Sequence, residues 1–243
     1  MKRVSVVTIC FNDLHGLRKT VKSVLSQRRD LFEYVIVDGN SKDGSVEYLE
    51  SIRLDIDVLV TEPDKGIYDA LNKGWQRSSG DFVIFMNSGD TFFCADTIEK
   101  VIPYLTDEVD LAYGDACLMG GLVQGKVKRH PNKMSGFWLI RDVVAHQSQF
   151  ISRSLLAKNG GYDLEFSIAS DYNFLAKVFW TQNVVFSRIP FIVCNFNTEG
   201  LSSSPRSRAT VENERHQIHM KYAPFWVRFI YYTYAKLNKW IGR

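Results

Sequence analysis

The chain has 243 residues, 45% hydrophobic and 23% charged, which suits one folded domain or one domain with an extension. Its net charge of +3 is too small and too dispersed for a nucleic-acid-binding face, so no nucleic-acid partner is expected. Four widely spaced cysteines without C-x-x-C spacing predict neither a zinc site nor a disulfide framework, and they favour a reducing cytoplasmic compartment.

The first 90 residues alternate between short apolar runs and segments in which apolar residues recur at helical spacing. Strands that alternate with helices predict a parallel sheet covered on both faces, with ligands bound at the carboxyl ends of the strands. Trp75 falls on the apolar side of its helix and is predicted to lie in the core. Strands are expected at residues 4–10, 34–37, 58–60 and 81–86. Helices are expected over 14–25, from 46–49 onward, and over 67–77.

Beyond residue 90 the pattern is looser and predicts a small second sheet. The expected elements are a helix at 96–105, a strand at 111–113, a hairpin of 116–119 and 122–127 turning at Gly120-Gly121, a strand at 149–151, a helix at 170–180 and a strand at 189–196. The Ser-rich stretch 200–208 predicts a loop or linker, after which the chain carries a helical extension.

The tail 221–243 contains five Lys/Arg, eight aromatic residues and no acidic residue. An amphipathic helix of this composition is typical of binding to an anionic membrane surface, although a helix packed on the main domain is the alternative. His216 and His219 lie three residues apart without a nearby acid cluster, so they are predicted as surface residues and not as metal ligands.

Two carboxylates follow predicted strands. Asp90 closes the turn Asn87-Ser88-Gly89-Asp90, and a hard oxygen ligand at this position suits Mg²⁺ or Mn²⁺. Asp38 ends the second strand, where an acid can accept hydrogen bonds from a nucleotide base or ribose. The alternatives are a turn-forming role for Asp90 and an Asx turn for Asp38. Because residues 11–16 lack a glycine-rich phosphate loop, phosphates are expected near Asp90.

Four segments, in this order and spacing, resemble glycosyltransferase family 2. They are Val4–Asn12 (VSVVTICFN), Val35–Ser45 (VIVDGNSKDGS), Glu62–Gly74 (EPDKGIYDALNKG) and Met86–Asp90 (MNSGD). The resemblance covers about the first 90 residues. It implies a GT-A fold, with a mostly parallel Rossmann-like central sheet, and inverting transfer of a sugar, hexosyl in type, from a nucleotide-diphosphate donor.

The resemblance also implies a division of the chain and a donor site. Residues 1–208 would form the catalytic domain, with a nucleotide-sugar-binding half (1–95) and an acceptor-binding half (96–208), and residues 209–243 the extension. The donor, for which a UDP-sugar is favoured, would be bound by Thr8, Cys10, Asn12, Asp38, Asn40, Ser41, Lys65, Gly66, Asp69, Asn72 and Ser88. Without the resemblance, Lys65-Gly66 would be an ordinary turn, and Asp69 and Asn72 a solvated helix face.

The family's metal motif usually has more acidic residues than this chain, in which Asn87 and Gly89 replace two acids and Asp90 remains as the ligand for Mn²⁺ or Mg²⁺. Asp171 matches the family's catalytic base, whereas Ser170 replaces the usual Glu; the alternative for Asp171 is stabilisation of the helix dipole. His146, followed by Gln147, is a further catalytic candidate that would meet the acceptor or the leaving diphosphate.

Among family members, the chain is most similar to short bacterial enzymes that build surface polysaccharides on lipid-linked acceptors. The resemblance therefore predicts a glycan or lipid-linked oligosaccharide acceptor and a cytoplasmic enzyme, peripheral on the inner face of the cell membrane. A non-catalytic protein that binds a nucleotide sugar or glycan on the same fold is the alternative. A sugar nucleotidyltransferase ranks last, because its glycine-rich phosphate loop is missing.

Overall fold

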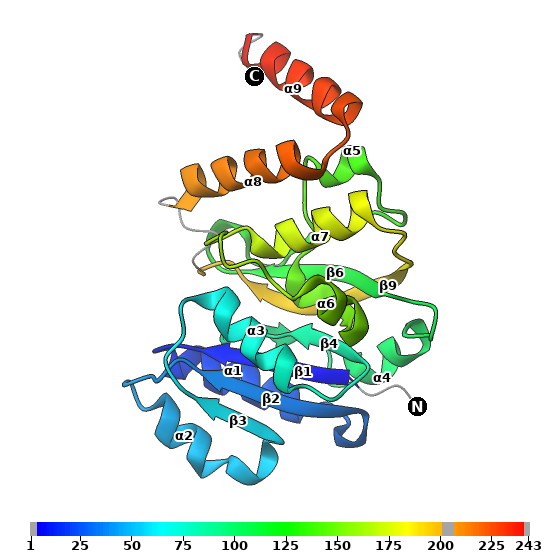
Figure 1. Ribbon diagram of the computed structural model, residues 1–243. Helices are drawn as coiled ribbons and strands as arrows, with labels where there is room; N and C mark the ends of the chain where they lie inside the picture. Colours follow the sequence, from blue (N-terminus) through cyan, green and yellow to red (C-terminus); the bar gives the residue numbers. More distant parts are fainter. Residues whose placement is uncertain (1–3, 201–206, 241–243) are drawn as a thin grey trace.

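The computed structural model describes residues 4–200 and 207–240, with side chains up to residue 233. Its strands form one sheet in the order β3-β2-β1-β4-β8-β6-β9-β5, and β7 pairs with β6 (Figure 1). The strands are β1 (Val4–Cys10), β2 (Phe32–Asp38), β3 (Val58–Thr61), β4 (Phe82–Phe85), β5 (Thr91–Phe92), β6 (Leu111–Met119), β7 (Lys126–Lys128), β8 (Gln149–Ser152) and β9 (Phe186–Asn197).

Helices cover the sheet and extend the chain beyond it (Figure 1). They are α1 (Leu14–Leu25), α2 (Ser45–Ser51), α3 (Ile67–Arg77), α4 (Thr97–Val101), α5 (Gly136–Leu139), α6 (Arg153–Asn159), α7 (Ser170–Thr181), α8 (Arg208–Tyr222) and α9 (Phe225–Trp240). A short 3₁₀ turn, η5 (His146–Ser148), precedes β8. Most of the predicted linker 200–208 lies outside the described residues.

The first half of the sheet is parallel, as the alternating pattern predicts. β1 pairs with β2 and with β4, and β2 pairs with β3, all in parallel. Cys10, Asp38 and Thr61 are register partners at the ends of their strands, so the segments that follow meet at one edge of the sheet. This edge is where the sequence places the ligand site.

The second half differs from the prediction in two ways. The strands expected to form a small second sheet continue the first one, because β8 pairs antiparallel with β4 and with β6. In addition, β6 is one long strand where the sequence predicts two short ones. Gly114 interrupts the apolar pattern, but its missing side chain lets β9 approach, since a Cβ there would meet Val193 Cγ2 at 2.4 Å. The register shifts around Asp115 as in a β-bulge, and the strand continues.

Apolar side chains alternate along the central strands and fill two cores. Val7 and Ile9 of β1 face the core beneath α3, α6 and α7, whereas Val4 and Val6 face the core beneath α1 and α4. Trp75 belongs to the first core and is 8% exposed, which confirms its predicted burial.

The C-terminal helices pack on different parts of the molecule and contact each other where Tyr232 Oη of α9 lies 2.8 Å from His216 Nδ1 of α8. α8 lies on α7, whereas α9 projects beyond it, away from the sheet (Figure 1). Pro224 separates the two helices, and α9 is attached by Val227, which is fully buried with Ala223 and Ile140. Among the described residues, no helix combines the length and apolarity needed to cross a bilayer.

Gly74 allows α3 to lie directly on β1, because a Cβ at this position would come within 2.3 Å of Val7 Cγ1. We expect Gly74→Ala to lower the free energy of unfolding by about 1–3 kcal/mol, the usual cost of overpacking, despite the better helix propensity of Ala. Urea denaturation measures this change. Gln76→Ala, on the exposed side of the same helix, is the control and should change stability by less than about 0.5 kcal/mol. Equal stability of the two variants would contradict the close packing.

Candidate active site

A cleft of about 420 Å³ lies where β4, η5, α3, α7 and α8 meet. Four predicted site residues line it: Ser88, Asp90, His146 and Asp171. The cleft is also lined by Tyr68, Asn87, Lys128, Gln147 and Arg215. A second cavity of about 480 Å³, beside Phe93 and Arg129, contains none of the predicted site residues. The cleft of Asp90 and Asp171 is therefore the candidate active site.

Asp171 is the second residue of α7 and presents its carboxylate to the cleft. Burial alone would raise the pKa of this carboxyl group, but hydrogen bonding to His146, to the N–H of Tyr172 and to the O–H of Tyr68 holds the pKa below its usual value. Tyr172 N donates to Asp171 Oδ1 at 2.8 Å, and Tyr68 Oη donates to the same oxygen at 3.1 Å. Asp171 is therefore ionised at neutral pH.

His146 links the two sides of the cleft. Its Nδ1 lies 3.4 Å from Asp171 Oδ2, and its Nε2 lies 3.0 Å from Asn87 Nδ2. Because a side-chain amide NH₂ only donates, Nε2 accepts this bond and the imidazole proton sits on Nδ1, facing the carboxylate. The turn after β4 is thus connected to the start of α7 through one imidazole.

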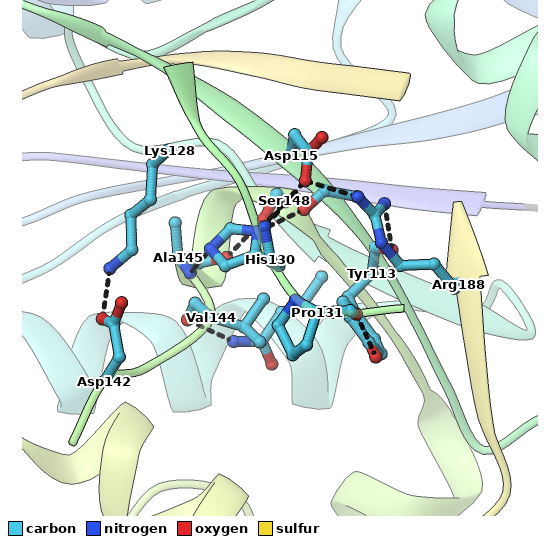
Figure 2. Close-up of polar contacts among 12 residues, drawn as sticks. Tyr113, Asp115, Lys128, His130, Pro131, Asp142, Val144, Ala145, Ser148 and Arg188 are labelled. Atoms are coloured by element: carbon cyan, nitrogen blue, oxygen red, sulfur yellow. Dashed lines mark hydrogen bonds and ion pairs between the residues drawn. The ribbon is translucent and has the colours of Figure 1, made fainter. Parts of the chain in front are cut away.

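A buried histidine holds the segment that carries His146. Figure 2 shows His130 between Asp115 and Ala145: its backbone N–H donates to Asp115 Oδ1 at 2.8 Å, and its Nε2 accepts the N–H of Ala145 at 3.4 Å. Its Nδ1 is 2.6 Å from the carbonyl of Gly114. Burial lowers the pKa of His130 to about 4, so the ring is neutral and has one donor and one acceptor for these bonds.

Asp90 is buried at the inner end of the cleft. Its Oδ1 accepts the N–H of Asn197 at 2.8 Å, and its Oδ2 accepts Gln147 Nε2 at 3.0 Å. Burial raises the pKa of this carboxyl to about 6, although these hydrogen bonds act in the opposite direction. The surrounding groups therefore stabilise the ionised form of Asp90 by less than its desolvation destabilises it.

The residues around Asp90 fit a divalent cation through oxygen ligands. Among the described residues, no three His, Cys, Asp or Glu side chains converge as a metal site. However, Asn87 Oδ1 and Gln147 Oε1 are buried without a hydrogen-bond partner in the part of the chain that the structure describes, and both residues line the cleft. Mg²⁺ and Mn²⁺ prefer carboxylate and carbonyl oxygens, and Mg²⁺ commonly takes one or two carboxylates together with substrate phosphates.

The other predicted donor-binding residues do not line this cleft. One group lies at the ends of β1 and β2, where Asp38 accepts both the N–H and the hydroxyl of Ser41, at 2.8 and 2.7 Å. The hydroxyl of Ser41 in turn accepts the backbone N–H of Asn12 at 2.8 Å. This group consists of Thr8, Cys10, Asn12, Asp38, Asn40 and Ser41.

A second group lies on and before α3. Asp69 accepts the N–H of Lys65 at 2.9 Å, which closes the turn at Gly66. Asn72 is buried and bonds both the N–H and the carbonyl of Tyr162, so it is not on a solvated helix face. These contacts hold both ends of the α3 segment from which Tyr68 reaches Asp171.

Sequence reasoning missed Tyr68 and Arg215, and it placed His219 wrongly. His219 is 3% exposed, not a surface residue, because α8 packs on α7 and its Nε2 lies 2.8 Å from the hydroxyl of Tyr172. Arg215 stacks over the ring of Tyr172 at 4.7 Å. No local pattern marks these residues, since their roles depend on contacts between distant segments.

The fold and the cleft define a class of protein: an α/β protein with two carboxylates in one cleft beside the carboxyl ends of its parallel strands. Residues 5–152 match the family model described as Glycosyl transferase family 2, and the chain belongs to this family of glycosyltransferases. An uncharacterized glycosyltransferase of Mycobacterium tuberculosis is 36% identical over 96% of this chain and 90% of its own length. The PGL/p-HBAD biosynthesis glycosyltransferase of the same species is 24% identical, covering 81% of this chain and 77% of that protein.

Solved structures confirm the predicted GT-A fold. Residues 1–349 of TarS from S. aureus match with a TM-score of 0.70 at 17% identity, covering 91% of this chain and 66% of the TarS chain. The mannosyltransferase PcManGT of Pyrobaculum calidifontis, solved with GDP-Man and Mn²⁺, matches with a TM-score of 0.62 at 17% identity. That match covers 98% of this chain and 80% of PcManGT.

The raised pKa of Asp90 gives a stability test. Its folded-state pKa of about 6 exceeds the ordinary value of about 3.9, so the folded protein binds this proton more tightly and loses stability as pH rises from about 4 to about 6. We expect Asp90→Asn to remove this loss and to stabilise the protein at pH 8 by about 1–3 kcal/mol, measured by urea denaturation with EDTA.

The new amide can keep the bond from Asn197 N–H and donate to the carbonyl oxygen of Gln147. Asp55→Asn, at an exposed position, is the control and should stay within about 0.5 kcal/mol of the wild type. If the Asp90→Asn variant is less stable than the wild type at pH 8, the buried, ionised carboxylate of Asp90 does not destabilise the folded protein.

Proposed function

We propose that the protein is an inverting, hexosyl-type glycosyltransferase. It moves a sugar from a nucleotide-diphosphate donor, with a UDP-sugar favoured, to a hydroxyl of a glycan acceptor, and the acceptor is lipid-linked. The pathway is bacterial cell-surface polysaccharide biosynthesis. The observation that carries this proposal is the presence of Asp90 and Asp171 in one cleft at the carboxyl edge of the sheet.

In this proposal Asp171 is the general base. A sugar hydroxyl is a poor nucleophile, and a positioned carboxylate that accepts its proton typically gives about 10²–10⁴ in rate. The hydroxyl attacks the anomeric carbon on the face opposite the nucleotide, its proton passes to Asp171, and the bond to the diphosphate breaks, which inverts the configuration. His146 orients the carboxylate through its Nδ1–H and lies close enough to contact the acceptor or the leaving group.

Asp90, with the free carbonyl oxygens of Asn87 and Gln147, would hold Mn²⁺ or Mg²⁺. When bound, the ion would neutralise charge on the donor diphosphate. Arg215 lines the same cleft and adds positive charge there, whereas Lys128, which also lines it, is ion-paired with Asp142 at 2.9 Å. The groups at the ends of β1 and β2 and around residues 65–72, together with Ser88, would bind the nucleotide and the donor sugar.

A turnover experiment tests this assignment. Wild type is screened with nucleotide sugars and Mn²⁺ or EDTA, by release of the nucleotide diphosphate and by thermal shift. We expect Asp171→Asn to lower kcat by about 10²-fold or more, and Asp90→Ala to abolish the stimulation by Mn²⁺. Asp96→Asn, at an exposed position, is the control for loss of one carboxylate.

Unchanged turnover in both cleft variants would remove the site assignment. A wild type that is stabilised by a nucleotide sugar but never turns it over would favour the alternative of a non-catalytic binding protein, because ligands that bind the native state raise its apparent stability.

We also propose that residues 209–243 are an extension of the catalytic domain 1–208 and that residues 221–243 dock it on the anionic inner face of the cell membrane. Phe225, Trp226, Phe229 and Ile230 form the exposed apolar face of α9, while Val227 on its other face is buried. Within 221–243 the sequence has five basic and no acidic residues, each basic one adding about 1 kcal/mol near an anionic leaflet before screening. Residues 241–243 lie outside the described residues.

Replacing this apolar face should weaken vesicle binding. We expect Phe225→Ser/Phe229→Ser to lower partitioning onto phosphatidylserine-containing vesicles by about 10-fold or more, because each buried Phe contributes about 1.5 kcal/mol or more. Sedimentation measures the bound fraction. Leu54→Ser/Leu122→Ser removes two exposed apolar side chains elsewhere and should bind as wild type does. Equal binding by all three proteins would refute membrane docking through α9.

A further inference from the structure

Glu214 of α8 is a buried carboxylate that lines no part of the cleft but binds the segment leading into α7. Its side chain is 8% exposed, and all its described hydrogen bonds go to residues 167–169. Oε1 accepts the N–H and the hydroxyl of Ser167, at 2.8 and 2.7 Å. Oε2 accepts the N–H groups of Ile168 and Ala169, at 3.1 and 2.8 Å.

These bonds hold the segment that leads into α7. Ala169 is the N-cap of α7, and Glu214 accepts its N–H together with those of the two preceding residues, Ser167 and Ile168. Inside the helix, the N–H of Tyr172 bonds to Asp171 itself. The single hydroxyl proton of Tyr68 is shared between two acceptors, the carbonyl of Ile168 in the same segment at 2.5 Å and Asp171 Oδ1 at 3.1 Å.

α8 holds the other side of Asp171 as well. His219, five residues after Glu214, lies with Nε2 2.8 Å from the hydroxyl of Tyr172. This hydroxyl donates to the carbonyl of Leu139 at 2.9 Å, so the imidazole donates to it. Two residues of α8 therefore bind the chain on either side of Asp171. Glu214 accepts hydrogen bonds from residues 167–169, and His219 donates one to Tyr172.

We propose that Glu214 is a positioning residue for the transfer reaction, which fixes the backbone of residues 167–169 so that Asp171 meets the acceptor hydroxyl. This inference rests on the proposed function, in which Asp171 is the base. A general base acts only within hydrogen-bond reach of its proton, and a displacement of about 1 Å can cost about 10²-fold in rate. The role needs a multidentate acceptor with the reach of a Glu side chain, since four donors converge on it.

The test compares kcat and the donor KM of Glu214→Gln and Glu214→Ala with wild type, using the full chain at a temperature where all are folded by circular dichroism. We expect Glu214→Ala to lower kcat by about 10-fold or more while the donor KM changes less than about two-fold, because the bonds of Glu214 lie on the Asp171 side of the cleft and not at Asp90. Glu214→Gln keeps one acceptor oxygen, so its kcat should lie between those of Glu214→Ala and the wild type. Glu212→Gln, exposed on the same helix, is the matched control.

A kcat per folded molecule within two-fold of wild type in Glu214→Gln would overturn the proposal and leave Glu214 with a stabilising role only. If Glu214→Ala does not fold, the kcat of the isosteric Glu214→Gln variant, judged by the same two-fold limit, is sufficient to test the proposal. The result is separable from the proposed function: a wild type without transfer activity refutes that function, whereas an active wild type with an equally active Glu214→Gln refutes only the role of Glu214.

Discussion

The partly buried carboxylate of Asp171 is the group around which the cleft is organised. An anion removed from water stays ionised only if fixed donors replace its hydration. Here the donors come from three separate segments: His146 from η5, Tyr68 from α3 and the backbone of Tyr172 at the start of α7. The geometry of this one group therefore depends on the whole arrangement of helices over the sheet.

The sheet supplies that arrangement through a change of strand direction. β4 ends beside β1 in the parallel half, while β8 runs antiparallel beside it and is preceded by η5. The turn after β4 and the residues before β8 consequently meet, which brings Asn87 to His146 and Asp90 to Gln147. His130 then anchors the segment before η5 to β6.

The sequence predicts the features that local patterns encode and misses those that depend on distant contacts. Alternating apolar runs predict the parallel half closely, and α3 spans the predicted residues 67–77. Asp90, His146 and Asp171 also meet in one cleft, since each follows or precedes an element with a clear pattern. Glu214 and His219 escape detection because their partners lie about 45 residues away on α7 and its approach. The sequence wrongly predicts two strands in place of β6. Gly114 interrupts the apolar pattern as a turn would, although its role is to let β9 pack closely.

The two carboxylates of the cleft have opposite electrostatic environments, and this difference argues for different roles. Asp90 is buried and Asp171 partly buried, yet Asp171 has an imidazole and two further donors and keeps a low pKa, whereas burial raises the pKa of Asp90 to about 6. Asp171 is thus ionised and ready to accept a proton without a further ligand. The ionised form of Asp90 is destabilised by desolvation, and a bound cation would offset this cost. The side-chain carbonyl oxygens of Asn87 and Gln147, which have no hydrogen-bond partner in the described part of the chain, could also bind that cation. Carboxylates whose pKa values are pushed apart within one site commonly divide proton transfer from charge stabilisation in this way.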